Sequence, residues 1–195
     1  RRPDAYKEGG FMDRDTADML DRVAPPPGES LDIAISGAMP PMAQSSSEVC
    51  WATVAAMMVN WRDQASASVQ DVLAGIQHGA GANAPNYLEL YTANQALSPE
   101  HKPGFLAALG MTAVSPMSFD AMGYADLLRR HGPLWLTVDR DVSEGYSVHA
   151  LVVIGLRGEA PDVTLTYIDP DGGVEVSESL ADFQRKVEEL ARGDL

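Results

Sequence analysis

The chain has 195 residues, enough for one domain with its own hydrophobic core. It carries 14 Lys and Arg against 28 Asp and Glu, a formal net charge of −14, which argues against nucleic-acid and anionic-membrane partners and favours a basic protein partner. No apolar run approaches the roughly 20 residues that cross a bilayer, and Cys50, as the only cysteine, excludes an internal disulfide and a Cys-rich zinc site.

The N-terminal segment, residues 1–30, is charged and polar and ends in the stiff turn Pro25-Pro26-Pro27-Gly28. We expect a short helix near Thr16–Val23 and interpret the segment as an extension or linker outside the main domain, residues 31–195. Because the chain begins at Arg1 rather than Met, we expect an excised domain or a processed form.

A short strand at 31–35 and a loop containing Gln44 precede the strongest helical pattern, at residues 48–63. Ser45 and Glu48 have the spacing of a capping box at its start. Helical periodicity predicts one buried face made of Cys50, Val54, Met57, Met58 and Trp61. The cysteine therefore falls in the first helical turn, with the Gln44 loop lying over that end.

The middle of the chain is predicted to be helical and the later part to be β-rich. Further helices are expected at 69–77, 87–97 and 120–131, the first two capped by Ser68 and Asn86. Three later runs, separated by polar or Gly/Pro turns, predict an antiparallel sheet: 134–138, 147–156 and 163–168.

The chain is expected to close with a helix at 178–191, capped by Ser177 and buried along one stripe. Helices followed by a sheet and a final helix indicate the α+β class.

Cys50 admits two interpretations. Free cysteines are among the most buried residue types, so it can be a small core residue. At a helix N-terminus, however, unpaired N–H groups and the helix dipole stabilise a thiolate, and the same N–H groups can receive an oxyanion. A nucleophilic role requires a base nearby.

Among the four histidines, His149 is the candidate base, because it opens an apolar strand that would hold its ring rigidly; a structural histidine is the alternative. The other three, His78, His101 and His131, fall at helix ends or in polar segments. Asp169 ends the strand at 163–168 and could orient His149 if the two strands pair. It could equally be part of a turn over 169–173.

Gln44, Cys50-Trp51, the run from His149 to Gly155, and Asp169 together resemble the papain-like cysteine proteases. That family has a Gln six positions before its nucleophile, a Trp after the Cys, a His opening an apolar strand, and then an Asn or Asp. The resemblance spans about 44–183. It implies an α+β papain-like fold, with the Cys at a helix N-terminus in a helical half and the His and Asp on an antiparallel sheet half.

The resemblance also implies roles for individual residues. Cys50 would be the nucleophile, His149 the general base and then acid, and Asp169 the group that orients His149. The Gln44 side-chain amide and the Cys50 backbone N–H would form the oxyanion hole. No metal or organic cofactor is required. Trp51 is a candidate for substrate contact, with a core position as the alternative.

The sequence departs from the papain signature in ways that point to a bacterial branch. Residues 46–51 read Ser-Ser-Glu-Val-Cys-Trp instead of ending in Cys-Gly-Ser-Cys-Trp, the disulfide cysteines are missing, and Asp169 stands where papain has an Asn before Ser-Trp. The chain is closer to the double-glycine leader peptidases and to secreted effector proteases, whose Cys-Trp-Ala-Thr start resembles 50–53.

The resemblance implies a cysteine endopeptidase acting on a protein substrate. We further expect an effector or toxin delivered by a bacterial secretion system into the cytoplasm of a target cell and neutralised by a cognate immunity protein. Two alternatives remain open. One is a peptidoglycan amidase or deamidase on the same Cys–His scaffold, and the other is a papain-like binding module without activity.

Overall fold

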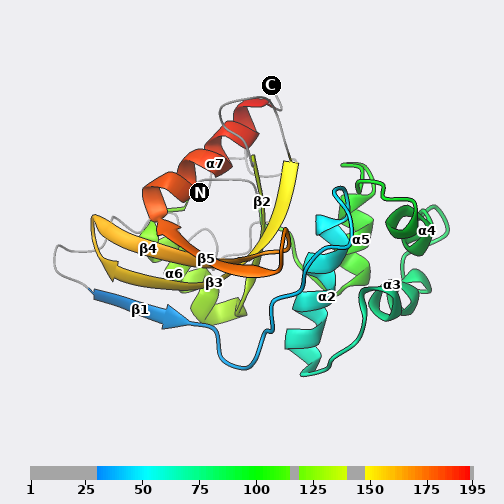
Figure 1. Cartoon of the computed structure of the whole chain (residues 1–195), viewed down its shortest axis with the longest axis horizontal. Coiled ribbons are helices and arrows are strands. Elements are labelled where there is room, and N and C mark those ends of the chain that lie inside the picture. The colour runs from blue at the N-terminus through cyan, green and yellow to red at the C-terminus, as the bar shows by residue number, and fades with distance from the viewer. Residues whose placement is uncertain (1–29, 115–118, 140–147, 194–195) are drawn as a thin grey trace, which may run out of the picture.

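The structure, a computed structural model, describes residues 30–114, 119–139 and 148–193. Its helices and strands divide into a helical half and a sheet half (Figure 1), which confirms the expected α+β fold of papain-like type. The predicted helix near Thr16–Val23 lies outside the described residues. The elements are β1 (Ser30–Ala34), α2 (Cys50–Asp63), α3 (Val69–Gln77), α4 (Tyr87–Thr92), α5 (Lys102–Ala108), α6 (Ala121–His131), β2 (Leu134–Asp139), β3 (Val148–Glu159), β4 (Asp162–Asp169), β5 (Val174–Ser179) and α7 (Leu180–Gly193).

The five described strands form one antiparallel sheet centred on the long strand β3. β4 pairs with one edge of β3, and β5 pairs with the outer edge of β4. Two strands share the other edge of β3: β2 pairs with its first half, where Val138 lies opposite His149, and β1 pairs with its second half, where Ala34 lies opposite Gly155. The first residues of β3 thus reach the end of the sheet near the helical half.

Helices cover both faces of the sheet. Side chains alternate along a strand, so neighbouring residues of β3 face opposite sides. Leu151 and Val153 pack in the core under α6 and α7, whereas Ala150 and Val152 pack against Val54 of α2. The sheet therefore presents one face to the two C-terminal helices and the other to the helix that begins at the cysteine.

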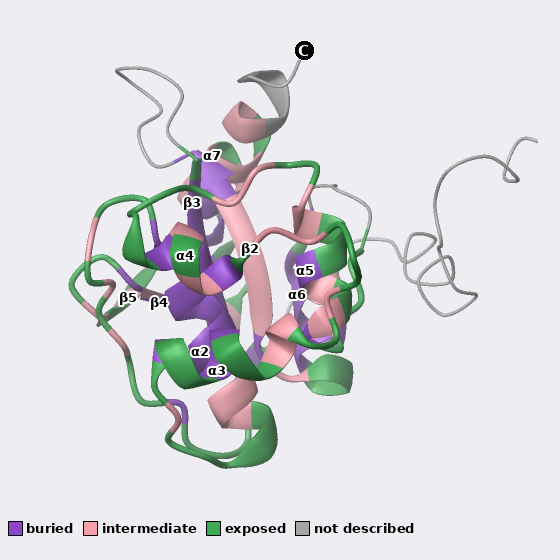
Figure 2. Cartoon of the chain, turned by 90° about the vertical axis from the view of Figure 1, so that its right-hand side faces the viewer, coloured by how far each residue is buried: buried purple, intermediate pink, exposed green. Residues whose placement is uncertain are grey.

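Helix α2 is buried on more sides than its sequence predicts. Residues 51–57 are all buried, where periodicity predicted a single buried stripe. The reason is that α2 lies between two layers: Val54 and Met57 face the sheet, and Trp51 and Ala55 face α3–α5. Figure 2 shows the buried segments concentrated in the interior, with exposed turns around them.

An aromatic cluster joins the two halves. Phe105 of α5 is fully buried, and its ring makes edge contacts with Tyr87 at 4.7 Å, Trp51 at 5.1 Å and Trp135 at 6.2 Å between centroids. Because Trp135 comes from β2, this cluster fixes the helical half against the sheet. Such edge-to-face pairs add stabilisation beyond the area they bury.

Two boundaries differ from the predictions. Helix α4 ends at Thr92 instead of residue 97, because Asn94 adopts a left-handed conformation with φ +52°. Strand β5 occupies residues 174–179, so the final helix begins at Leu180, and Ser179 rather than Ser177 accepts the capping hydrogen bond from the backbone N–H of Asp182. The sequence pattern predicted no strand here, and only the last two residues of β5 fall within the predicted helix at 178–191.

No helix in the described ranges combines the length and apolar character needed to cross a membrane.

Candidate active site

Cys50 is the first residue of α2 and is partly buried. The predicted capping box is wrong: Val49 is the N-cap residue, and it makes no side-chain capping hydrogen bond. The backbone N–H of Ala52 already donates to the carbonyl of Val49 at 3.1 Å, whereas the N–H groups of Cys50 and Trp51 have no hydrogen-bond acceptor among the described residues. An uncapped N-terminus suits an anion at this point.

His149 and Asp169 meet at one end of the sheet. His149 is the second residue of β3 and Asp169 the last residue of β4, and the antiparallel pairing of these strands brings the two together. The Nε2 of His149 lies 2.7 Å from Oδ1 of Asp169. A carboxylate can only accept, so the ring N–H donates. The backbone N–H of Asp171 donates to the same oxygen at 2.7 Å and holds the carboxylate in place.

Cys50 also interacts with the imidazole of His149 and contributes to the raised pKa of that ring. Since Nε2 is engaged by Asp169, Nδ1 is the ring nitrogen left to face the sulfur. The ring itself is only 4% exposed. Burial alone lowers the pKa of His149, but the interactions with Asp169 and Cys50 outweigh it and raise the pKa from 6.5 to about 9. The imidazole therefore carries its proton at neutral pH.

Gln44 lies in the loop before α2 and is tied to both neighbouring segments. Its backbone N–H donates to the carbonyl of Pro170 at 2.7 Å, and its Nε2 donates to the carbonyl of Ser47 at 3.2 Å. A side-chain amide has two N–H groups, so one remains for another acceptor. The Oε1 of Gln44 is buried and has no partner among the described residues.

The turn that follows Asp169 docks on the Gln44 loop through Gly173. Gly173 has φ +63°, and a Cβ at this position would lie 2.6 Å from the backbone nitrogen of Ala43. Only glycine permits both this conformation and this close approach. The segments that carry Asp169 and Gln44 are thereby held side by side.

Asn94 is a residue of the site that sequence analysis missed. Its Oδ1 accepts from the backbone N–H of Glu48 at 2.9 Å, and its Nδ2 donates to Oγ of Ser47 at 3.2 Å. Ser47 in turn accepts from Gln44, so Asn94 fixes the loop that leads into Cys50. The available signal was an Asn near a helix end, a residue type that tolerates the left-handed conformation.

Trp51 lies in the core, which was the alternative to a position in contact with substrate. Its ring is 4% exposed and packs among Tyr87 and Phe105, while its Nε1 donates to the carbonyl of Gln95 at 3.1 Å. This packing favours a structural role over substrate contact. No set of His, Cys, Asp and Glu side chains within the described residues is arranged to hold a metal ion.

A family model described as the papain-like cysteine protease AvrRpt2 matches residues 34–188. The matched range covers more than half of the chain and includes Gln44, Cys50, His149 and Asp169, so the expected resemblance is confirmed at the level of the family. A search of curated proteins finds no match.

Replacing Asp169 with Asn is expected to lower the pKa of His149 below its wild-type value of about 9, because the variant loses the charge that favours the imidazolium. The measurement is an NMR titration of the His149 ring. Asp171→Asn is the matched control, since it keeps the backbone N–H that binds Asp169. An unchanged His149 pKa in Asp169→Asn would contradict this account.

The raised pKa of His149 also predicts how the stability of the fold changes with pH. Because the folded-state pKa is raised, the stabilisation from the protonated ring is fully present below about pH 6.5 and is lost as the pH rises through about 9. Urea unfolding should therefore show a wider gap between wild type and Asp169→Asn at pH 6 than at pH 10.

Proposed function

Because the chain belongs to the AvrRpt2 family of papain-like cysteine proteases, we propose that it is an endopeptidase that cleaves its protein target through a Cys50 thioacyl intermediate. The observation that carries the proposal is the hydrogen bond between His149 and Asp169, together with the effect of Cys50 on the pKa of the same imidazole. A nucleophile, a base and an orienting carboxylate in this order form the constellation of acyl transfer.

In the first half of the proposed reaction, the Cys50 sulfur attacks the carbonyl carbon of the scissile bond and forms an S–C bond. The carbonyl electrons move to oxygen. As the tetrahedral intermediate collapses, the C–N bond breaks and His149 gives its proton to the leaving amine. The raised pKa of His149 supports this step, because the ring holds that proton at neutral pH.

In the second half, a water molecule attacks the thioester while neutral His149 takes one of its protons. The S–C bond breaks, the acid product leaves and the sulfur returns as thiolate beside the reprotonated imidazole. Asp169 keeps Nε2 bonded throughout, so the Nδ1 side of the ring faces the reacting atoms in both halves.

The negative oxygen of each tetrahedral intermediate needs donors that are already in position. We assign this role to the backbone N–H of Cys50 and to the free N–H of the Gln44 amide. The bond from Gln44 to Ser47 supports the assignment, because it fixes the orientation of the amide. Losing one such donor typically lowers the rate by 10² to 10³.

We also propose that residues 31–195 form the catalytic domain and that 1–30 form an extension. The family match, which begins at residue 34, supports this division.

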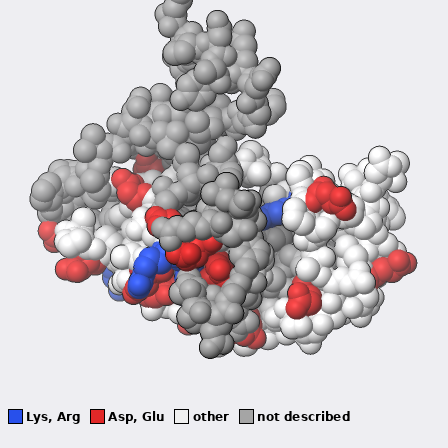
Figure 3. Space-filling model, turned by 90° about the horizontal axis from the view of Figure 1, so that it is seen from above, with Lys and Arg blue, Asp and Glu red and all other residues white. Residues whose placement is uncertain are grey.

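The biological setting follows from the family, which is one of bacterial effector proteases. We propose delivery by a secretion system into the cytoplasm of a target cell, where the chain acts as a toxin unless a cognate immunity protein covers the site. The net charge of −14 favours a basic partner. In Figure 3, acidic side chains are spread over the described part of the face shown, and basic side chains are fewer.

Cys50→Ala is expected to lower proteolysis by about 10³-fold or more, because it removes the nucleophile. Purified wild type, Cys50→Ala and the control His131→Ala, at the exposed end of α6, would be incubated with a panel of denatured proteins and with peptidoglycan. Equal cleavage of proteins by wild type and Cys50→Ala would sink the proposal. Thiol-dependent release from peptidoglycan alone would favour an amidase.

Asn94→Gly is expected to lower kcat/KM by about 10-fold, mostly through kcat, because the loop bearing Gln44 loses its anchor. Glycine keeps the left-handed backbone, so the variant removes only the side-chain bonds. Gln64→Gly is the matched control, since Gln64 has φ +48° at the opposite end of α2. The rate of Cys50 alkylation should stay unchanged in both variants. A full kcat/KM in Asn94→Gly would contradict this role.

Expression of residues 31–195 in the cytoplasm of a target cell is expected to slow growth, and Cys50→Ala should abolish the effect at equal protein level. Growth curves with immunoblots would measure this. If the Cys50→Ala variant were equally toxic, the growth defect would not depend on the proposed hydrolysis, and the toxin proposal would be contradicted.

A further inference from the structure

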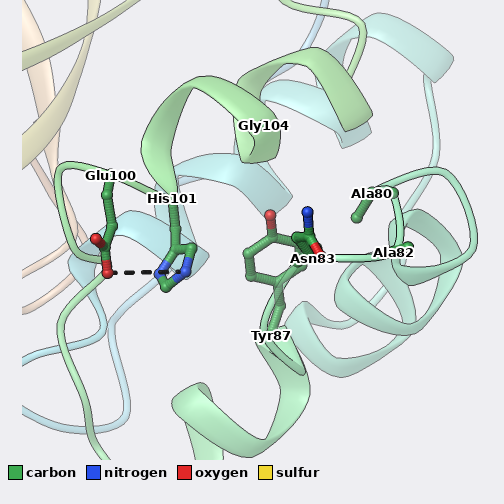
Figure 4. A pocket seen from close by; sticks show the side chains of 9 residues that line it. Ala80, Ala82, Asn83, Tyr87, Glu100, His101 and Gly104 are labelled. Carbon is green, nitrogen blue, oxygen red and sulfur yellow. Dashed lines mark ion pairs between the residues drawn. The ribbon is translucent and has the colours of Figure 1, made fainter.

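A pocket of about 410 Å³ opens on the helical half, between the loop that follows α3 and the start of α5. Figure 4 shows the side chains that surround it. Its wall includes the small side chains of Ala80 and Ala82 and four polar residues, Asn83, Tyr87, Glu100 and His101. We refer to it as the Tyr87 pocket.

The polar groups of the Tyr87 pocket are held in place but incompletely partnered. Tyr87 is 1% exposed, yet no described residue hydrogen-bonds its hydroxyl, which points into the pocket (Figure 4). Burial raises the pKa of this phenol, so it keeps its proton. The Nδ1 of His101 is bonded to Oγ of Ser98 at 2.8 Å, and its Nε2 faces Oε1 of Glu100 at 3.9 Å. A ligand can therefore complete these bonds.

The lining restricts the chemistry of that ligand. Glu100 is acidic, none of the described residues that line the pocket is Lys or Arg, and the whole chain is acidic, so an anion is disfavoured. A purely apolar group is disfavoured as well, because it would displace water from the Tyr87 hydroxyl without replacing its hydrogen bond. A long side chain with an apolar stem and a cationic tip meets both conditions.

The Tyr87 pocket is also connected to the proposed active site. The ring of Tyr87 lies 6.4 Å from the ring of Trp51, the residue after Cys50. Tyr87 begins α4, and Asn94, just beyond the end of that helix, holds the loop that leads into Cys50.

We propose that the Tyr87 pocket receives a Lys or Arg side chain of the protein substrate, an assignment that rests on the proposed protease function. The stem lies against Ala80 and Ala82. The cationic group donates hydrogen bonds to the hydroxyl oxygen of Tyr87 and to Oδ1 of Asn83, and the exposed carboxylate of Glu100, on the other side of the His101 ring, adds negative charge at the rim. The pocket thereby selects basic substrates at one position away from the scissile bond.

The binding test uses the full chain with Cys50→Ala, so its outcome does not depend on catalysis. The ¹⁵N-labelled protein is titrated with N-acetyl-lysine amide and, as control, with N-acetyl-norleucine amide, which has the same stem without the ammonium group. Lysine amide should shift the amide signals of residues 80–84 and 100–104, and norleucine amide should not. Tyr87→Phe should weaken the effect by about 2- to 10-fold. Equal shifts with both probes, or none, would overturn the proposal.

The specificity test uses peptides released from a proteome by an enzyme that cuts after Glu, so that Lys and Arg stay internal. Mass spectrometry of the cleaved products should show Lys or Arg enriched at one fixed distance from the scissile bond. Tyr87→Phe and Glu100→Gln should reduce this enrichment at least 2-fold.

Matched controls for the specificity test are Tyr124→Phe, which removes another buried hydroxyl without a described partner, and Glu159→Gln at an exposed hairpin. Both should leave the enrichment unchanged. Peptide cleavage without such enrichment overturns the pocket assignment but leaves the proposed protease function intact. Failure of N-acetyl-lysine amide to bind in the NMR titration overturns the pocket assignment whether or not peptides are cleaved.

Discussion

The arrangement of the site depends on one protonated imidazole held between the Cys50 sulfur and the Asp169 carboxylate. His149 is buried, and burial alone would remove its charge. The interactions with Asp169 and Cys50 reverse that effect and keep the ring cationic at neutral pH. Because Cys50 begins α2 and His149 lies near the start of β3, this pairing can exist only where the helical half and the sheet half are fixed against each other.

Two sets of contacts fix the helical half against the sheet half, one near the site and one farther away. Asn94 of the helical half is hydrogen-bonded to the loop that carries Gln44. The backbone N–H of Gln44 in turn donates to the carbonyl of Pro170, in the turn after Asp169. Gly173 allows this turn to approach the loop closely enough for that bond. Farther from the site, the ring of Phe105 packs against both Trp51 and Trp135. Displacing any one of these groups would move the proposed nucleophile relative to its base.

The helical half also contains a polar group that the core packing leaves without a partner. Trp51 is used for packing, so the residue beside the cysteine does not offer a surface to the substrate. The unpartnered hydroxyl of Tyr87 lies in a pocket on the far side of the same aromatic cluster. The half that supplies the proposed nucleophile thus also holds the site that we assign to substrate selection.

The sequence alone determined the elements whose signals are local. The helix starts at Ser68 and Asn86 follow from capping side chains, the helix of residues 121–131 follows from its amphipathic pattern, and the hydrophobic runs of β2, β3 and β4 follow from residue type. It also singled out the four residues to which we assign the proposed chemistry, because their order and spacing resemble a known family.

Contacts between residues far apart in the chain had to come from the tertiary structure. Asn94 fixes the segment before α2 by hydrogen-bonding Ser47 and Glu48, which lie far from it in the sequence, and α2 is buried on both sides because two layers enclose it. The raised pKa of His149 and the placement of the unpartnered Tyr87 hydroxyl in a pocket are likewise products of tertiary contacts. Each depends on burial and on partners brought together by folding, and neither leaves a pattern in the local sequence.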